Sequence, residues 1–315
     1  MIPPYRLWCA ADRMSNIKHI RCGVCGADKP QVKGIPFASE QARNVTPGWQ
    51  EISVVQCGLC GFYYADPMPC WDDDGLQALY GGEYFGDESA WWHYKRTTVD
   101  PQRRLDSIEK GGVRGRLLDV GCGQGYFLEQ ALSRGWEVCG MEPSKTWADN
   151  TSKRLNVRVL AQSVEQANIP PNSFDAVFSD SVIEHLPEPM TMMNMVGKVL
   201  KQGGMFYVVT PNADALVNHV RGLAFRLMGS KRSPYTEPLM IPYHVTGFTP
   251  RSIALLAQKA GFEVRHLWVR HGGEEWRKEK KWTVSRLKAA MLTPILLLGE
   301  LIGHGTTIEA LLIKK

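Results

Sequence analysis

Short apolar runs alternate with amphipathic runs from residue 116 onward, and this alternation constrains the fold more than any other feature of the chain. The apolar runs have the length of strands, and the runs between them have the length and periodicity of helices. Repeated units of this kind need crossover connections, which place helices on both faces of a parallel sheet. The sequence therefore predicts an α/β fold.

The positions of these elements follow from the apolar runs, from the glycines that can end helices and from Ser144, which can cap one. Strands are expected at 116–120, 137–142, 157–162, 174–180, 205–210, 262–269 and 306–314. Helices are expected at 126–135, 144–155, 187–204, 251–261 and, upstream of the sheet, about 91–110. The basic residues of the upstream helix are interleaved with apolar ones, a pattern that can indicate nucleic-acid binding but more commonly marks a solvated helix face over a core; they are Lys95, Arg96, Arg103 and Arg104.

Two segments, 213–250 and 272–305, are longer than simple connections require. Long segments between regular elements are typically lids or binding loops. The second segment carries a charged run followed by an apolar run, so a surface helix, a substrate lid and ordinary core packing all remain open for it.

Two C-x-x-C-G motifs lie near the start of the chain, with Cys22 and Cys25 in the first and Cys57 and Cys60 in the second. The two-residue spacing lets both thiolates of a motif face one cation, and two motifs supply the closed four-sulfur shell of structural zinc. A redox pair or four unrelated thiols is the alternative, and the duplication favours zinc. We expect an N-terminal segment with a zinc ribbon at 1–70 and a connector with the leading helix at 71–110.

The first strand–helix turn reads LLDVGCGQGYF, with glycines at 121, 123 and 125. The dinucleotide-binding fingerprint places its third glycine one residue later. Asp119 is available here for a cationic amine, and Glu142 at the end of the second strand can accept both hydroxyls of a ribose. An amine and a nucleoside without a pyrophosphate describe S-adenosylmethionine better than NAD.

The segments LLDVGCGQGYF, GMEPS, PPNSFDAVFSDSVIEHLPEP, KVLKQGGMFYVVTPN and FTPRSIALLAQKAGFEV occur in the order typical of one family. In them the chain resembles the class I S-adenosylmethionine-dependent methyltransferases. The resemblance implies a Rossmann-like, doubly wound sheet, mostly parallel with an antiparallel last strand, and a methyltransferase domain at 111–315. The upstream QCGLCGFYYADPMP is similar to the zinc-ribbon head of bacterial methyltransferases of sugar and polysaccharide biosynthesis.

The resemblance also implies roles for individual residues at the strand ends. Around the methionine moiety it places Asp119, Gly121, Gly123 and Gly125, with Glu142 at the ribose. Adenine would lie between Ser163 and Val164, and the sulfonium near Asp180 and Ser181. The family usually has an acid after the third strand, where this chain has Gln162 and Ser163, so the adenine contact departs from the pattern.

An alcohol or carbon acceptor must lose a proton on methylation, so a base with a pKa near neutrality is expected. His185, after the fourth strand, and His244, near the end of the first long segment, are the two candidates. Either can instead position or cap a loop. Glu184 is interpreted as a capping acid.

The sequence predicts transfer of a methyl group to a hydroxyl or carbon of a sugar, nucleotide-sugar or related small metabolite. Basic residues of the first long segment can meet a phosphate on a nucleotide-sugar or lipid-linked sugar acceptor, or anionic lipid headgroups; they are Arg221, Arg226, Lys231 and Arg232. The alternatives are an RNA methyltransferase, which a net charge of +5 disfavours, and a non-catalytic scaffold. Without a secretory signal or a sufficiently long apolar run, a cytoplasmic protein is expected, at most peripheral to a membrane.

Overall fold

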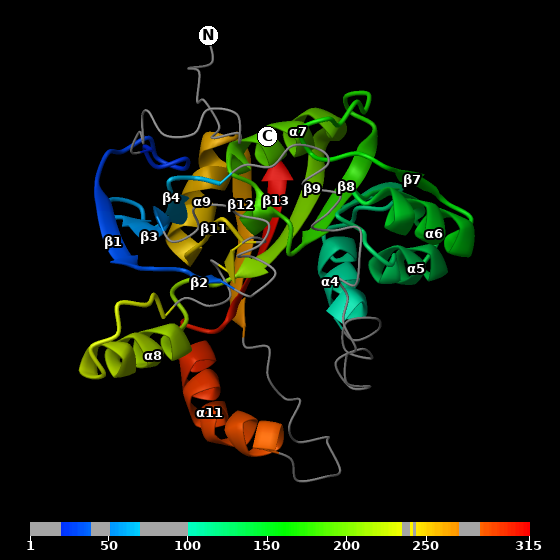
Figure 1. Cartoon of the computed structure of the whole chain (residues 1–315). Coiled ribbons are helices and arrows are strands. Elements are labelled where there is room, and N and C mark those ends of the chain that lie inside the picture. Colours follow the sequence, from blue (N-terminus) through cyan, green and yellow to red (C-terminus); the bar gives the residue numbers. More distant parts are fainter. Residues whose placement is uncertain (1–19, 39–50, 70–99, 235–239, 242–243, 271–283) are drawn as a thin grey trace.

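The computed structural model describes residues 20–38, 51–69, 100–234, 240–241, 244–270 and 284–315 (Figure 1). The expected helix over 91–99, with Lys95 and Arg96, and the charged run at 272–283 lie outside these residues. Of the helix expected at 91–110, the described part is α4, Asp100–Glu109.

The largest sheet of the described chain has seven strands in the order β12-β13-β9-β8-β5-β6-β7. Its strands are β5 Arg116–Val120, β6 Glu137–Met141, β7 Arg158–Leu160, β8 Phe174–Asp180, β9 Leu200–Pro211, β12 Phe262–Arg270 and β13 Thr307–Lys314. Strands β7, β6, β5, β8 and β9 are parallel, whereas β13 runs antiparallel to both of its neighbours. The predicted Rossmann-like sheet with an antiparallel last strand is confirmed.

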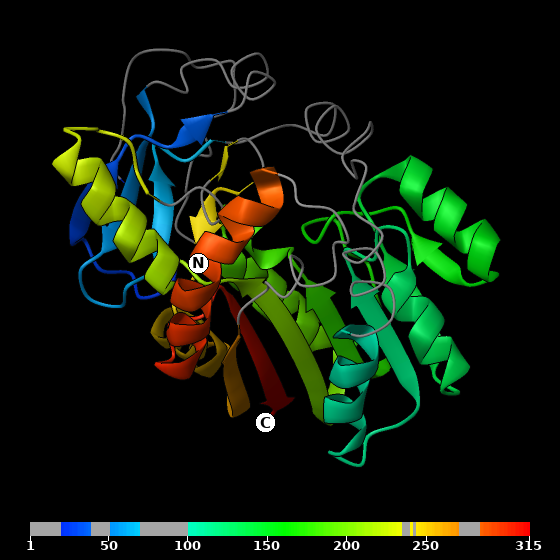
Figure 2. The same ribbon diagram turned by 90° about the horizontal axis from the view of Figure 1, so that it is seen from below.

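Helices cover this sheet and extend beyond one edge of it (Figures 1 and 2). They are α5 Tyr126–Ser133, α6 Lys145–Leu155, α7 Pro189–Val199, α8 Leu216–Leu227, α9 Pro250–Lys259 and α11 Val284–Leu301, with a 3₁₀ turn at Ile183–His185. The Ser144 side chain accepts a hydrogen bond from the Trp147 amide, so the predicted cap of α6 is present. None of the described helices combines the length and apolarity needed to cross a bilayer.

The helix predicted at 187–204 is too long, because α7 ends at Val199 and β9 begins at Leu200. Phe174 pairs with Leu200 but Ala176 pairs with Met205, so extra residues are accommodated as an irregularity in the β8–β9 pairing. The two glycines at 203 and 204 therefore mark a bulge rather than a helix end. Strand pairing, rather than the helix-like spacing of the sequence, therefore decides the structure of residues 200–204.

The four-stranded sheet of the N-terminal part has the order β1-β3-β4-β11. Its strands are β1 Pro30–Gly34, β3 Ser53–Cys57, β4 Tyr63–Asp66 and β11 Thr246–Gly247. A second, two-stranded pairing joins β2 Phe37–Ala38 to β10 Met240–Ile241. Strands β10 and β11 belong to the segment predicted to be a lid or binding loop. Strand β11 completes the four-stranded sheet, which we call the ribbon, and β10 forms the separate pairing with β2.

The ribbon and the α/β unit, which consists of the seven-stranded sheet and its helices, share one hydrophobic core. Val55 and Phe62 of the ribbon belong to the same buried cluster as Val120 of β5 and Phe248 after β11. The rings of Phe62 and Phe248 lie 5.2 Å apart between centroids. Burial of one such aromatic side chain stabilises a fold by roughly 1.5–3 kcal/mol, so the ribbon contributes to the stability of the whole described unit.

Candidate active site

Three acidic side chains lie at the carboxyl ends of neighbouring parallel strands. Asp119 is at the end of β5, Glu142 follows β6, and Asp180 ends β8. Strand β5 pairs with both β6 and β8, so these ends meet at one edge of the sheet. In open α/β sheets, ligands bind at this edge.

The glycine turn after β5 is held tightly against β6. The Gly121 amide donates to the Met141 carbonyl at 2.7 Å, and the Gly125 amide donates to the Cys122 carbonyl at 2.7 Å. Gly121 has φ 74°, and a Cβ there would come within 2.3 Å of the Val182 side chain. Because both the backbone angle and the space exclude a side chain, this turn requires glycine.

Glu142 connects the glycine turn to the start of α6. One carboxylate oxygen accepts a 3.0 Å hydrogen bond from the Gly123 amide, and the other accepts one of 3.0 Å from the Ser144 amide. Burial raises the pKa of Glu142, and these two amides oppose that shift. Each oxygen keeps a further lone pair, so the carboxylate can accept hydrogen bonds from two neighbouring hydroxyls while it holds the turn.

Asp119 is almost completely buried behind the turn. Burial raises the pKa of Asp119 well above its ordinary value, and the nearby carboxylates of Asp180 and Glu142 raise it further. Concentrated negative potential of this kind favours a cationic ligand group, which would relieve the repulsion. The site therefore has the electrostatic character needed to receive a positively charged amine or sulfonium.

Two side chains form hydrogen bonds with Asp180 at the end of β8. Its Oδ2 accepts an ion-paired hydrogen bond of 2.6 Å from Nη1 of Arg104 on α4, and its Oδ1 accepts one of 2.9 Å from the Ser181 hydroxyl. Ser181 adopts a left-handed conformation with φ 58°, which turns the chain directly after the strand. Arg104 is buried, so the expectation that it forms part of a solvated helix face is wrong.

A buried carboxylate explains why α4 turns its arginines inward. Glu309, in the middle of β13, receives two 2.6 Å hydrogen bonds from Arg103, one of 3.3 Å from Arg104, one of 3.1 Å from Arg270 and one of 2.8 Å from the Tyr207 hydroxyl. These partners hold the pKa of Glu309 at about 2 despite its burial. The sequence offered one signal for this network, a lone acid in the otherwise apolar strand TIEALLIK.

Ser163 and Val164 lie in the loop after β7, with Val164 buried and Ser163 half-buried. The Glu142 amide donates to the Leu160 carbonyl at 2.9 Å, which holds the end of β7 beside the residue after β6. The loop expected to flank adenine therefore begins next to the carboxylate expected to bind ribose.

His185 and His244 meet although they are far apart in the sequence. His185 ends the 3₁₀ turn after β8, His244 precedes β11, and their rings are 4.7 Å apart edge to face. Burial and the neighbouring His185 hold the pKa of His244 well below its ordinary value. A neutral imidazole is the form that can accept a proton.

Glu184, interpreted from the sequence as a capping acid, is completely buried beside the two histidines. The Thr210 hydroxyl donates to its Oε2 at 3.0 Å, while Oε1 has no hydrogen-bond partner among the described residues. Burial raises the pKa of Glu184 to about 8. Its carboxyl is therefore predominantly neutral near pH 7.

The four cysteines of the two C-x-x-C-G motifs converge. Sγ of Cys22 lies 3.5 Å from Sγ of Cys60, Sγ of Cys25 lies 3.5 Å from Sγ of Cys57, and all four sulfurs are within 4.8 Å of one another. Tetrahedral zinc with bonds of about 2.3 Å separates its sulfurs by about 3.8 Å. The cluster therefore fits a structural zinc ion.

The sequence of this chain is similar to those of known methyltransferases. A family profile described as "Methyltransferase domain" matches residues 91–267. The ubiquinone biosynthesis O-methyltransferase of Photobacterium profundum is 26% identical over 197 residues, covering 58% of this chain and 81% of that protein. The protein of the same name from Alkalilimnicola ehrlichii is 33% identical over 120 residues, covering 35% of this chain and 49% of that protein.

The fold of this chain is also similar to that of a solved methyltransferase structure. The crystal structure of an S-adenosylmethionine-dependent methyltransferase from Archaeoglobus fulgidus aligns with a TM-score of 0.50 at 18% identity, over 72% of this chain and all of that one. The two sequence relatives described above carry the name of an O-methyltransferase of ubiquinone biosynthesis rather than of a sugar methyltransferase. The sugar acceptor expected from the sequence gains no support from them.

Proposed function

The chain belongs to the class I S-adenosylmethionine-dependent methyltransferases, and on that basis we propose that it methylates a hydroxyl oxygen of a small molecule. The observation that carries the cofactor part of the proposal is the hydrogen-bonded unit of Gly123 and Glu142 at the edge of the sheet. The oxygen acceptor is supported by the O-methyltransferase names of the relatives. A carbon acceptor, or the hydroxyl of a sugar or nucleotide-sugar, is the alternative.

S-adenosylmethionine would supply a methyl group on a positively charged sulfur, a reactive centre that the protein need only align and shield. In our proposal Asp119 faces the cofactor amine and the glycines of the turn allow the backbone to approach the methionine moiety. Glu142 accepts the ribose hydroxyls, Ser163 and Val164 flank the adenine, and Asp180 and Ser181 lie near the sulfonium. The burial of Asp119 and Glu142 and the two hydrogen bonds of the Glu142 carboxylate support this assignment.

We assign His244 as the base and His185 as the residue that positions it. As the acceptor oxygen is methylated, the proton that its hydroxyl loses would pass to the His244 imidazole. His185 lies edge-on against the His244 ring, which supports its positioning role. The lowered pKa of His244 keeps the ring in the neutral form that can accept a proton, but makes it a weaker base than the near-neutral group expected from the sequence.

The four-cysteine cluster would hold a structural zinc ion in the proposed function. All four positions of a tetrahedral ion would be taken by sulfur, so no open position remains for substrate. The ion would stabilise the ribbon, whose core is continuous with that of the α/β unit. It takes no part in the methyl transfer that we propose.

Helices α8 and α11 lie side by side at one margin of the described structure (Figure 2) and supply a second part of the proposal, peripheral contact with a membrane. Large apolar side chains are exposed on both; they are Val220, Leu223, Leu227, Leu292, Leu297, Leu298 and Leu301. Basic residues accompany α8; they are Arg221, Arg226, Lys231 and Arg232. Apolar and basic side chains together suit an anionic lipid surface, where an acceptor with an apolar portion would also be found.

Calorimetric titration with S-adenosylmethionine tests the cofactor part. We expect saturable binding that is lost in Asp119→Ala and Glu142→Ala, and no binding of NAD. Methyl transfer to simple phenols, to nucleotide-sugars and to RNA then distinguishes the acceptor classes. A wild-type protein that binds NAD but not S-adenosylmethionine would overturn the proposal, and preferential methylation of sugars or RNA would replace its acceptor.

A further inference from the structure

A third cluster of ligand-type side chains among the described residues, besides the four cysteines and the group of Glu184, His185 and His244, lies beside the carboxyl end of β9. Asp214 precedes α8, His219 is on that helix, and His304 lies between α11 and β13. The Asp214 carboxylate is 2.8 Å from Nε2 of His219 and 3.3 Å from Nδ1 of His304. The three residues can each offer one ligand atom within 4.8 Å of the others.

The backbone holds two of these residues in place through the buried side chain of Asn212. Its oxygen accepts a 3.0 Å hydrogen bond from the Asp214 amide, and its side-chain nitrogen donates to the Gly305 carbonyl at 2.7 Å. The Asn212 amide also donates to the Thr306 carbonyl at 2.8 Å. The segments that carry Asp214 and His304 are thereby joined, although about ninety residues separate them.

Hydrogen bonds fix both the backbone and the ring of His304. Its carbonyl accepts from the Leu216 amide at 2.8 Å, which connects it to the first residue of α8. Its Nδ1 lies 2.8 Å from the Asp214 carbonyl oxygen. The same nitrogen faces the Asp214 carboxylate at 3.3 Å, so the ring is held with Nδ1 toward that carboxylate.

We propose that Asp214, His219 and His304 bind one divalent transition-metal cation of the zinc type. Two imidazoles and one carboxylate are a common ligand set for such ions. An isolated surface ion pair requires only one histidine, whereas here two histidines approach one carboxylate. A cation shared by all three side chains accounts for that convergence.

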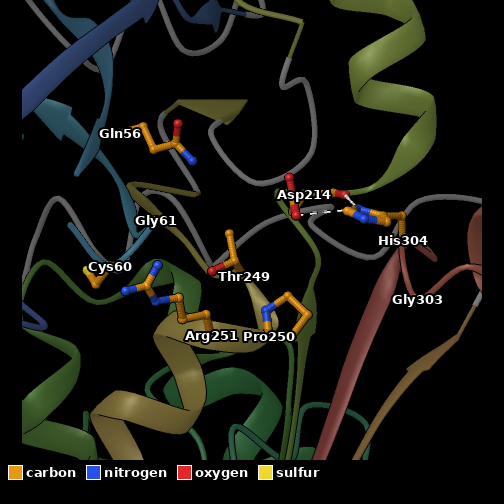
Figure 3. Close-up of a pocket in the computed structure, with 9 residues that line it drawn as sticks. All are labelled: Gln56, Cys60, Gly61, Asp214, Thr249, Pro250, Arg251, Gly303 and His304. Carbon is orange, nitrogen blue, oxygen red and sulfur yellow. Dashed lines mark hydrogen bonds and ion pairs between the residues drawn. The ribbon is translucent and has the colours of Figure 1, made fainter. Parts of the chain in front are cut away.

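A pocket of about 330 Å³ adjoins the cluster and gives the ion an open side (Figure 3). Asp214 and His304 form one wall, and Gln56, Cys60 and Gly61 of the ribbon contribute another. Three protein ligands leave at least one position of a tetrahedral ion free. A water or an oxygen atom of a small molecule in this pocket would complete the coordination.

Equilibrium dialysis of the full-length protein against buffered zinc tests the proposal, with bound metal measured by mass spectrometry. We expect the wild type to bind one zinc equivalent more than His219→Ala/His304→Ala. The four-cysteine cluster is intact in both proteins, so it cancels from the difference. His266→Ala, which removes an exposed histidine on β12, is the matched control and should bind as much zinc as the wild type.

Equal zinc binding by the wild type and the double variant at every concentration would overturn the proposal. Circular dichroism and S-adenosylmethionine binding report whether the double variant is folded. If the double variant is not folded, the zinc bound by Asp214→Asn is compared with that of the wild type instead. The amide preserves the size of the side chain but removes the charged ligand, so equal binding would again overturn the proposal. The readout is bound metal, so its result is independent of whether the protein methylates the acceptor that we propose.

Discussion

Arg104 of α4 and Asp180 at the end of β8 are joined by an ion pair of 2.6 Å. Arg104 also reaches Glu309 in β13, so one buried guanidinium connects the leading helix to two strands of the main sheet. Asp180 is the residue expected near the cofactor sulfonium. The position of this carboxylate therefore depends on a helix outside the repeated strand–helix units.

Arg104→Gln tests this dependence. We expect the free energy of unfolding to fall by about 1.5–3 kcal/mol, because a charged hydrogen-bond donor is removed from two carboxylates. Affinity for S-adenosylmethionine should fall as well, since Asp180 loses the partner that orients it. Urea unfolding and calorimetry measure the two effects.

The matched control is Arg116→Gln, which removes an arginine whose ion pair with Glu137 is largely exposed, at 45% and 69% of the two side chains. Exposed substitutions of this kind usually change stability by less than about 0.5 kcal/mol. If both variants lost the same stability, the buried network would have no special role.

Glu142→Gln should weaken S-adenosylmethionine binding by about tenfold to a hundredfold. The neutral amide is a poorer acceptor for the Gly123 and Ser144 amides and for ribose hydroxyls, and a hydrogen bond to a charged group is worth roughly 1.5–3 kcal/mol. Glu137→Gln, an exposed change at the start of β6, the strand that Glu142 follows, should leave the dissociation constant unaltered. Calorimetry showing equal affinity for both variants would remove Glu142 from the site.

The buried Glu184 carboxyl makes stability depend on pH in a defined direction. Its pKa is about 8 in the folded protein and has an ordinary value of 4.5. Below pH 4.5 both states carry the proton; between pH 4.5 and 8 unfolding releases it, so the contribution of Glu184 to stability is lost as pH rises. Glu184→Gln has no proton to release and should gain stability relative to the wild type by a few kcal/mol over this range.

Urea unfolding of the two proteins at pH 5, 6.5 and 8 measures that difference. Glu165→Gln, at an exposed loop position, is the control and should follow the wild type. A stability difference between Glu184→Gln and the wild type that stays constant over the three pH values would contradict the assignment.

Removal of zinc from the four-cysteine cluster should lower the midpoint of thermal unfolding of the whole described unit. Val55 and Phe62 connect the ribbon to the common core, so loosening the ribbon exposes apolar surface of the α/β unit. Chelation, or Cys57→Ser with Cys60→Ser, should lower the midpoint by at least about 5 °C. Cys139→Ser, in β6 away from the cluster, should respond to the chelator as the wild type does, whereas Cys57→Ser with Cys60→Ser should no longer respond. Equal sensitivity of all these proteins would contradict a structural ion.

The sequence by itself determined the features that depend on neighbouring residues. The order of strands and helices, the glycine turn, the cap at Ser144 and the two cysteine pairs are local patterns, because periodicity and turn geometry act over a few residues. The convergence of Asp119 and Glu142 also followed from sequence, since parallel strands bring their carboxyl ends to one edge.

Only the tertiary structure decided which distant side chains became partners. Arg103 meets Glu309 across 206 positions, and His304 meets Asp214 across 90, so no local spacing indicates either pair. The same reason applies to β11, a two-residue strand that carries little propensity of its own and forms because β4 offers a free edge. Burial and pairing over long separations, rather than local preference, selected these contacts.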